Sequence, residues 1–366
     1  MNSKSLKNIL ISLIILLIIG ILMLVILPCI PTGKSTKVGY IMTGSTDEAG
    51  WNGMNYNGIK AACDSLGVRL EIKENILENT ESNDCVKAIS SLADKGCEMI
   101  ILSSYGYPSE VRDTIDEYPE ISFYGNSSDY YSDNMTSYFA RMYQARYLSG
   151  IVAGMTTETD NIGYVAAMQN NEVIRGLNAF TLGVKRVNPD ANVYVKWTDS
   201  WEDEEKETAA AEYLINEKDI DVITYHQNRN YVVSVAEKAG IYSIGYNEAT
   251  EGASDKHLTS AVWNWEELYS DIVSDFLQGK ANERQHIWCG IETGAVELAP
   301  YSPLVTAETQ AEVEKAKNEI LSGKDVFSGK IYDTDGNLRC DENEFISDTA
   351  LMSEFDWYVD GVIICE

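Results

Sequence analysis

Between residues 35 and 290, short apolar runs alternate with helix-length amphipathic stretches, and this arrangement occurs twice along the chain. Most of the apolar runs are followed directly by a cluster of polar or aromatic residues. Alternation of this kind predicts parallel sheets with helices on both faces. The expected strands are residues 38–43, 69–73, 99–103 and 122–124 in the first half, and 162–167, 193–198, 221–226 and 242–247 in the second half.

Amphipathic stretches between and after these strands predict the helices. A polar tail with an Asp-Gly turn predicts a hairpin around residues 333–337, and an apolar segment at 355–365 closes the chain. The expected helices are residues 51–66, 83–95, 141–155, 172–187, 203–217, 231–238, 265–278 and 307–321. Small residues along 141–155 indicate that this helix packs closely against a sheet.

The repeated pattern predicts an α/β fold with two doubly wound, parallel-sheet lobes. Ligands of open α/β sheets bind beyond the carboxyl ends of the strands, so two facing sheets would enclose a cleft. We expect lobe 1 to comprise residues 37–126 and about 259–292, and lobe 2 to comprise 127–258 and about 293–366. Crossovers between the lobes are expected at 127–134, 249–256 and 293–303, where polar residues accumulate.

The N-terminal segment, residues 1–36, has a different character. Lys4 and Lys7 precede an apolar stretch at 9–27, which has about the length that a membrane-spanning helix requires. Cys29 follows in a sequence similar to a bacterial lipoprotein cleavage box, although a proline occupies the place of the usual small residue. Lipidation at Cys29 and a retained helix both predict a globular part tethered to the extracytoplasmic face of the cell membrane.

Composition narrows the possible partners. The formal charge of −29 argues against nucleic-acid binding, because contacts to phosphates need a surface rich in lysine and arginine. At 366 residues and 45% hydrophobic, the chain is long enough for two lobes with a substantial core. Seven cysteines occur; six remain if Cys29 carries a lipid, and they fit disulfides or buried free thiols equally well.

Candidate binding residues lie at or just beyond the expected strand ends. Tryptophans there can stack on a flat ligand, or they can plug the core beneath a loop. Amides and the histidine can form hydrogen bonds with a ligand, although Asn and Gly are also common in turns after strands. A neutral lining of aromatic and amide groups favours an uncharged heteroaromatic ligand. The candidates are Trp51, Asn52, Tyr105, Tyr107, Asn126, Met168, Trp197, Trp201, His226, Gln227, Asn247 and Trp263.

The sequence offers little for catalysis or metal binding. Its three histidines form no close pair, and it contains neither a GxSxG motif nor a GxxxxGK phosphate loop. Residues 333–337 superficially resemble a calcium loop, but the glycine falls at the fourth position and a hairpin turn explains them better. We therefore expect no enzyme activity, no cofactor and no bound metal.

Seven sequence runs together resemble the basic membrane protein family, whose members are substrate-binding lipoproteins of ABC transporters. The resemblance extends from about Lys37 to the C-terminus. The runs are EAGWN (48–52), YQARYLSG (143–150), IGYVAA (162–167), EVIRGLNAF (172–180), VNPDA (187–191), IGYN (244–247) and FDWYVDG (355–361).

This resemblance implies a type I periplasmic-binding-protein fold with a hinge, a purine ligand, an ABC permease as partner and a monomeric state. In nucleoside-binding relatives, an aromatic residue at the position of Trp51 stacks on the base and acidic residues hold the ribose. Here Asn126 and Asn247 replace two such acids, which favours a free purine base over a nucleoside. A ligand-sensing surface receptor of the same fold is the alternative, and a nucleoside hydrolase would need a catalytic base that the sequence does not reveal.

Overall fold

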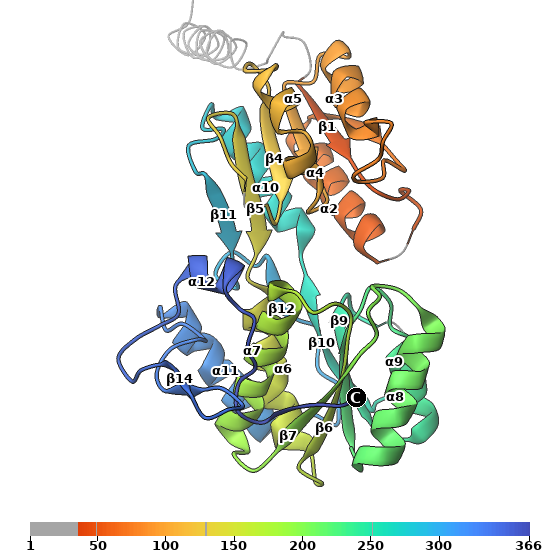
Figure 1. The fold of residues 1–366 in the computed structure, drawn as a ribbon, viewed down its shortest axis with the longest axis vertical. Coiled ribbons are helices and arrows are strands. Elements are labelled where there is room, and N and C mark those ends of the chain that lie inside the picture. The colour runs from red at the N-terminus through yellow and green to blue at the C-terminus, as the bar shows by residue number, and fades with distance from the viewer. Residues whose placement is uncertain (1–35, 49, 129, 251) are drawn as a thin grey trace, which may run out of the picture. The chain divides into compact units, whose positions relative to one another are not determined.

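The computed structural model describes residues 36–48, 50–128, 130–250 and 252–366. The apolar stretch at 9–27 and Cys29 lie outside these residues. Residues 37–366 form one compact unit with two large sheets (Figure 1). Within the part of the chain that is described, no helix combines the length and the apolarity needed to span a membrane.

The first sheet has six strands in the order β11-β5-β4-β3-β1-β2, and every strand pair in it is parallel. Its inner strands are apolar and buried on both faces, as parallel strands between helix layers require. The strands are β1 (Lys37–Ile41), β2 (Arg69–Lys73), β3 (Met99–Leu102), β4 (Ser122–Asn126), β5 (Met135–Ala140) and β11 (His286–Cys289). The helices are α2 (Trp51–Leu66), α3 (Asp84–Asp94), α4 (Tyr107–Glu110), α5 (Arg112–Asp116) and α10 (Trp265–Leu277).

The second sheet has seven strands in the order β12-β10-β9-β8-β6-β7-β15, and only β12 runs antiparallel to its neighbour. Helices α6 and α7 cover one face and α8 and α9 the other (Figure 1). The strands are β6 (Asn161–Ala166), β7 (Asn192–Trp197), β8 (Val222–His226), β9 (Tyr242–Asn247), β10 (His257–Trp263), β12 (Val296–Leu298) and β15 (Val362–Ile364). The helices are α6 (Met142–Thr156), α7 (Asn171–Val187), α8 (Glu204–Lys218) and α9 (Tyr231–Ala239).

Strand pairing moves two of the expected lobe boundaries. β5 pairs with β4 in the first sheet, and β10 pairs with β9 in the second sheet. The segments 127–134 and 249–256 therefore connect strands within one lobe instead of crossing between lobes. The chain crosses between the sheets at Arg141, at Asn264 and at residues 290–295. Polar loop composition suggested the crossovers, but turns inside a lobe have the same composition.

The sequence predicted that the small residues of α6 pack against a sheet; two of its glycines, Gly150 and Gly154, instead lie against helix α7. A Cβ atom on Gly150 would lie 2.0 Å from the Phe180 carbonyl oxygen, and one on Gly183 would lie 2.0 Å from the Tyr147 carbonyl oxygen. Glycine at both positions lets the backbones of α6 and α7 approach closely. This pair forms one wall of the second lobe.

The C-terminal segment completes the second lobe. Helix α11 (Ala307–Leu321) packs against α6, and helix α12 (Asp348–Ser353) packs against α7. Strands β13 (Ile331–Tyr332) and β14 (Leu338–Cys340) form the expected hairpin, in which Asp333 accepts hydrogen bonds from Asn337 and Arg339. These hydrogen bonds show that residues 333–337, which superficially resemble a calcium loop in the sequence, form the turn of the hairpin. The six described cysteines are all buried free thiols: Cys63, Cys85, Cys97, Cys289, Cys340 and Cys365.

Candidate functional site

Trp51 is the first residue of α2, ten residues after the last residue of β1. The N-cap position belongs to Gly50, which has a φ of 75° and no side chain with which to cap the helix. Asn228, from the loop after β8 in the other lobe, supplies the missing acceptor: its Oδ1 lies 2.8 Å from the Trp51 backbone nitrogen. The two lobes therefore touch through a helix cap contributed across the interface.

The Trp51 indole is half-buried in a group of three tryptophans. Its ring lies edge-to-face with Trp265 at 5.1 Å and with Trp263 at 6.3 Å, and its Nε1 donates to the Ser103 carbonyl oxygen at 3.2 Å. Trp263 and Trp265 flank the second crossover and stack on each other at 5.0 Å. The indole is thus held in one orientation at the carboxyl ends of β1 and β3, with part of its surface uncovered.

Asn247 connects three neighbouring strands at this edge of the second sheet. It adopts a left-handed φ of 75°. Its Nδ2 donates to the Gln227 carbonyl oxygen at 3.2 Å, and its Oδ1 accepts from the Trp263 indole at 3.1 Å. Both the oxygen and the nitrogen of this amide are therefore hydrogen-bonded within the protein. Asn247 lies at the end of β9, as expected, and it positions the Trp263 side chain.

Trp201 and Gln227 shape the neighbouring loop. Trp201 is 43% exposed, and its carbonyl oxygen accepts from the Asn228 backbone at 2.8 Å. Gln227 is fully buried. In the amide orientation that pairs both of its ends, it accepts from the Thr198 hydroxyl and donates to the carbonyl oxygens of Ser200 and Trp201. Gln227 therefore holds the loop that carries Trp201, and Asn228 links that loop to Trp51.

His226 ends β8 with its ring buried. The ring packs on Tyr246 at 4.1 Å, and its Nδ1 lies 3.5 Å from the Tyr164 hydroxyl. Its Nε2 has no hydrogen-bond partner among the described residues. Burial lowers the pKa of His226 well below its usual value, and the charges of Arg146 and Arg175 act in the same direction. His226 is therefore a neutral imidazole with one unused ring nitrogen.

Asn126 provides a similar group in the first lobe. It ends β4, it is buried, and its Nδ2 lacks a hydrogen-bond partner within the described chain. Unsatisfied buried donors are costly, which makes them good candidates for ligand contact. Among the candidate amides and the candidate imidazole within the described residues, Asn126 and His226 each have a side-chain nitrogen without a hydrogen-bond partner.

Three of the other candidates have local structural partners. Tyr107 is fully buried, with its hydroxyl bonded to the Ile76 carbonyl oxygen, so it is a core residue and not a ligand-facing one. Asn52 is paired with Glu48 and Thr43. Trp197 packs 6.4 Å from Tyr358 of the C-terminal segment. By contrast, Tyr105 is 66% exposed and Met168 is half-buried just beyond β6.

Sequence reasoning missed three residues that matter at this edge. The capping role of Asn228 had no sequence signal, because Trp51 lies 177 residues away in the chain. The sequence indicated no role for Glu172 beyond the start of an expected helix, yet its Oε1 lies 3.9 Å from His226 Nε2. The sequence placed Arg146 in an expected helix without indicating its burial, and it is fully buried among aromatic rings. Only the fold brings these groups together.

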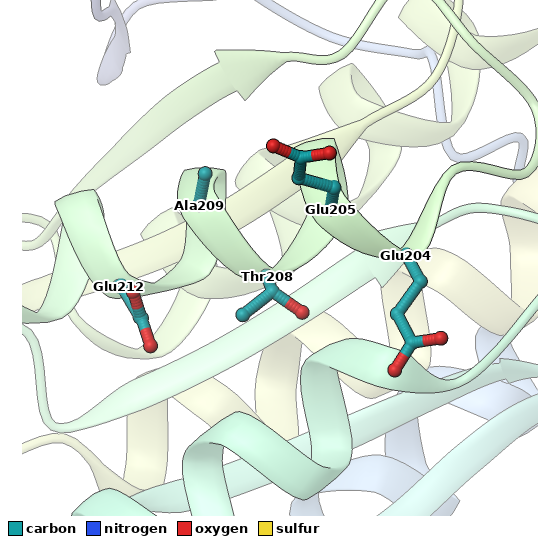
Figure 2. A pocket seen from close by; sticks show the side chains of 5 residues that line it. All are labelled: Glu204, Glu205, Thr208, Ala209 and Glu212. Atoms are coloured by element: carbon teal, nitrogen blue, oxygen red, sulfur yellow. The ribbon is translucent and has the colours of Figure 1, made fainter.

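A hollow of about 480 Å³ lies elsewhere, over one side of α8 (Figure 2). Its lining comes from a single helix and is mainly carboxylate: Glu204, Glu205, Thr208, Ala209 and Glu212. One helix face cannot surround a ligand, and an acidic lining does not suit a neutral ring. The strand ends of the two sheets remain the candidate site.

Residues 35–328 match the family described as ABC transporter substrate-binding protein PnrA-like. The chain belongs to this family. The family consists of solute-binding proteins and not of enzymes, and it implies a small-molecule ligand and a permease partner. The two-lobed topology is the type I periplasmic-binding-protein fold, which solved solute-binding proteins of ABC transporters share.

The names of individual relatives state different ligands. A purine-binding protein from Brucella abortus is 32% identical over 90% of this chain and 93% of its own length. A Haloferax volcanii protein named for glucose binding by an ABC transporter is 29% identical over 90% of this chain and 81% of its own. Among solved structures, a transcriptional activator of the comK gene from Bacillus halodurans superposes with a TM-score of 0.71. It is 22% identical and covers 79% of this chain and 99% of its own.

Proposed function

We propose that this family member captures a purine at the strand ends of its two lobes and delivers it to an ABC permease. The free base is favoured over the nucleoside. The observation that carries the proposal is the neutral, aromatic character of this edge: Trp51 and Trp201 lie on opposite lobes and are joined through Asn228. No sugar-binding acid stands at Asn126 or Asn247.

Aromatic stacking supplies the main attraction in this proposal. Trp51 presents uncovered indole surface from lobe 1, and Trp201 presents it from lobe 2. Flat rings that bury both faces against tryptophans gain a few kcal/mol from removing apolar surface from water. The unused nitrogens of Asn126 and His226 would then bind polar atoms on the ring edge.

Purine is favoured over glucose by the chemistry of the candidate residues. A sugar needs several hydrogen-bonding groups for its hydroxyls, commonly carboxylates, whereas the unpaired buried polar atoms of the candidate residues are nitrogens of Asn126, His226 and Trp197. The purine-binding relative is also the more similar of the two by sequence identity.

Calorimetry on the soluble part, residues 37–366, tests the proposal. The panel comprises adenine, hypoxanthine, guanine, their nucleosides, glucose and a neutral amino acid. We expect at least one free base to bind most tightly. Binding of glucose or an amino acid, with no purine tighter than millimolar, would overturn the ligand assignment while leaving the family membership intact.

Trp51→Ala gives the sharpest mutational test. We expect Kd for the preferred purine to rise about 30-fold, the equivalent of about 2 kcal/mol, because one stacking face is lost. Trp51→Phe should retain most of the affinity, since it keeps a flat ring. Tyr332→Ala, which removes a half-exposed aromatic side chain from the hairpin, is the matched control and should bind like the wild type. Equal affinities for all three variants would contradict the stacking role.

A ligand sensor without transport is the second candidate function. It is supported by the structural similarity to a protein described as a transcriptional activator. Transport would be demonstrated by ligand-stimulated ATP hydrolysis when the protein is added to its permease in vesicles. Binding without such stimulation favours the sensor.

A further inference from the structure

Glu172 and His226 direct polar atoms at the same place beside the strand ends. Glu172 lies in the first turn of α7, whose N-terminus is capped by Asn170. Its Oε1 is 3.9 Å from His226 Nε2, which is beyond hydrogen-bonding distance. The imidazole is neutral, as its lowered pKa indicates, so the two groups do not form an ion pair. Both atoms are therefore available to a third group.

The surroundings fix the hydrogen-bonding character of His226. The Tyr164 hydroxyl is the group nearest to Nδ1, and a hydroxyl that donates there leaves the proton on Nε2. Arg146 lies behind this layer, with its guanidinium over the rings of Tyr164 and Tyr246 at 4.8 and 5.5 Å. That fixed charge opposes a second proton on the imidazole. The Nε2–H group is thus a buried donor without a partner among the described residues, on the side of the ring that faces Glu172.

The Glu172 carboxyl group supplies the complementary acceptor. No group among the described residues donates a hydrogen bond to it, although its side chain is only 26% exposed. Arg175, one turn further along α7, instead donates to the Leu351 carbonyl oxygen at 2.7 Å. A carboxylate held in this way can accept a hydrogen bond from a ligand without first losing a protein partner.

We propose that Glu172 is a specificity-determining residue that, together with His226, reads one edge of the purine and selects a 6-aminopurine over a 6-oxopurine. This inference rests on the proposed function. A 6-aminopurine has an exocyclic N–H donor beside an unprotonated ring nitrogen. The carboxylate accepts from the amino group, and Nε2–H donates to the ring nitrogen. A 6-oxopurine held in the same orientation directs its carbonyl oxygen at the carboxylate and its ring N–H at Nε2–H.

The mismatch has a predictable size. A buried polar group that loses its partner costs about 1–3 kcal/mol, which corresponds to about 5- to 150-fold in affinity. We therefore expect adenine to bind at least about 5-fold more tightly than hypoxanthine. Glutamine at position 172 carries both a donor and an acceptor, so it can satisfy either base.

Calorimetric titration of wild type and Glu172→Gln with adenine and with hypoxanthine is the test. We expect the variant to bind adenine less tightly, hypoxanthine at least as tightly, and to lose most of the preference. Glu205→Gln, the same change at an exposed acid on α8, is the matched control and should keep the wild-type ratio. Glu172→Asp retains the charge but retracts the carboxylate, so it should weaken adenine alone.

The outcomes separate the two proposals. If neither base binds the wild type, the proposed function fails. If both bind and Glu172→Gln and Glu172→Asp leave their ratio unchanged, the role of Glu172 is overturned and purine capture stands. A merely structural role for Glu172 would weaken both bases equally in both variants, which also contradicts the inference.

Discussion

Several buried polar atoms without partners belong to side chains around the strand ends. In the described part of the chain they include His226 Nε2, Asn126 Nδ2, and the Nε and Nη2 atoms of Arg146. Each such atom costs about 1–3 kcal/mol when it stays unsatisfied. A ligand that bonds to His226 and Asn126 recovers part of that cost. The same atoms that lower the stability of the unliganded protein therefore favour binding.

Glu207 offers a pH-dependent prediction at the residue scale. Its fully buried side chain accepts from the Asp203 backbone at 3.1 Å. Burial raises the pKa of Glu207 from 4.5 to about 7, and the nearby acids Glu202 and Asp203 add to the shift. Because the folded state holds this proton more tightly, the stabilising contribution is complete below pH 4.5 and is lost as pH rises through about 7.

Glu207→Gln should remove this loss, since an amide keeps the acceptor but does not ionise. We expect its free energy of unfolding at pH 8 to exceed that of the wild type by about 2 kcal/mol. Urea denaturation at pH 5 and pH 8 measures the difference. Glu205→Gln on the exposed side of α8 is the control and should change nothing. An unchanged pH dependence in Glu207→Gln would show that the acid is ionised without penalty.

At this scale the sequence predicted which residues lie near the strand ends better than it predicted which way their side chains turn. Trp51, His226 and Asn126 lie at the strand ends as expected. Tyr105 and Tyr107 looked alike in the sequence, but one is exposed and the other is in the core. A residue beyond a strand end can turn towards the ligand or back into its own lobe. Tertiary packing decides between these directions.

At the scale of elements, the expected helices and the eight apolar strands formed close to their expected bounds. The missed strands β5 and β10 mix polar and apolar residues, MTSYFA and HLTSAVW. Their polar side chains are buried because they bond to neighbouring backbone, as Thr259 does to the Ala299 carbonyl oxygen at 2.6 Å. Neither the alternation of an exposed strand nor a continuous apolar run marks them.

The cap across the interface leads to a prediction about α2. Asn228→Ala removes the acceptor at the start of this helix, and losing an N-cap costs about 1 kcal/mol. The bond forms only when the lobes touch, so we expect the loss to appear as about 5-fold weaker purine binding and not as a lower melting temperature of the unliganded lobes.

Asn230→Ala is the matched control for this change. Asn230 is exposed two residues further on, and it stands before α9 without a capping hydrogen bond. Calorimetry and thermal denaturation of both variants give the comparison. Equal affinity of Asn228→Ala and Asn230→Ala would show that the cap contributes nothing to closure.

At the scale of the whole molecule, the three crossovers are tied to one another. The Arg141 backbone donates to the Cys289 carbonyl oxygen at 2.6 Å, and the Asn264 backbone donates to that of Ala295 at 2.9 Å. Gln144 adds a side-chain bond to the Ile291 backbone at 2.9 Å. Residues at the ends of helices and strands that are hydrogen-bonded in this way can change backbone conformation together, as hinge closure requires. The repeated apolar pattern predicted two lobes, but only strand pairing reveals where the chain crosses.

Tethering at the membrane gives the last prediction. We expect Cys29 to carry a lipid, because it follows an apolar stretch of signal-peptide character and the family resemblance is to lipoproteins. In the source cells, the wild type should fractionate with membranes and show the added mass of acyl chains. Cys29→Ser should lose that mass and accumulate as a precursor that keeps residues 1–28. Cys97→Ser, a change at a buried thiol, should leave membrane fractionation and lipid mass as in the wild type. Equal membrane association of Cys29→Ser and wild type, with no lipid mass on either, would instead establish that the helix at 9–27 is retained as the anchor.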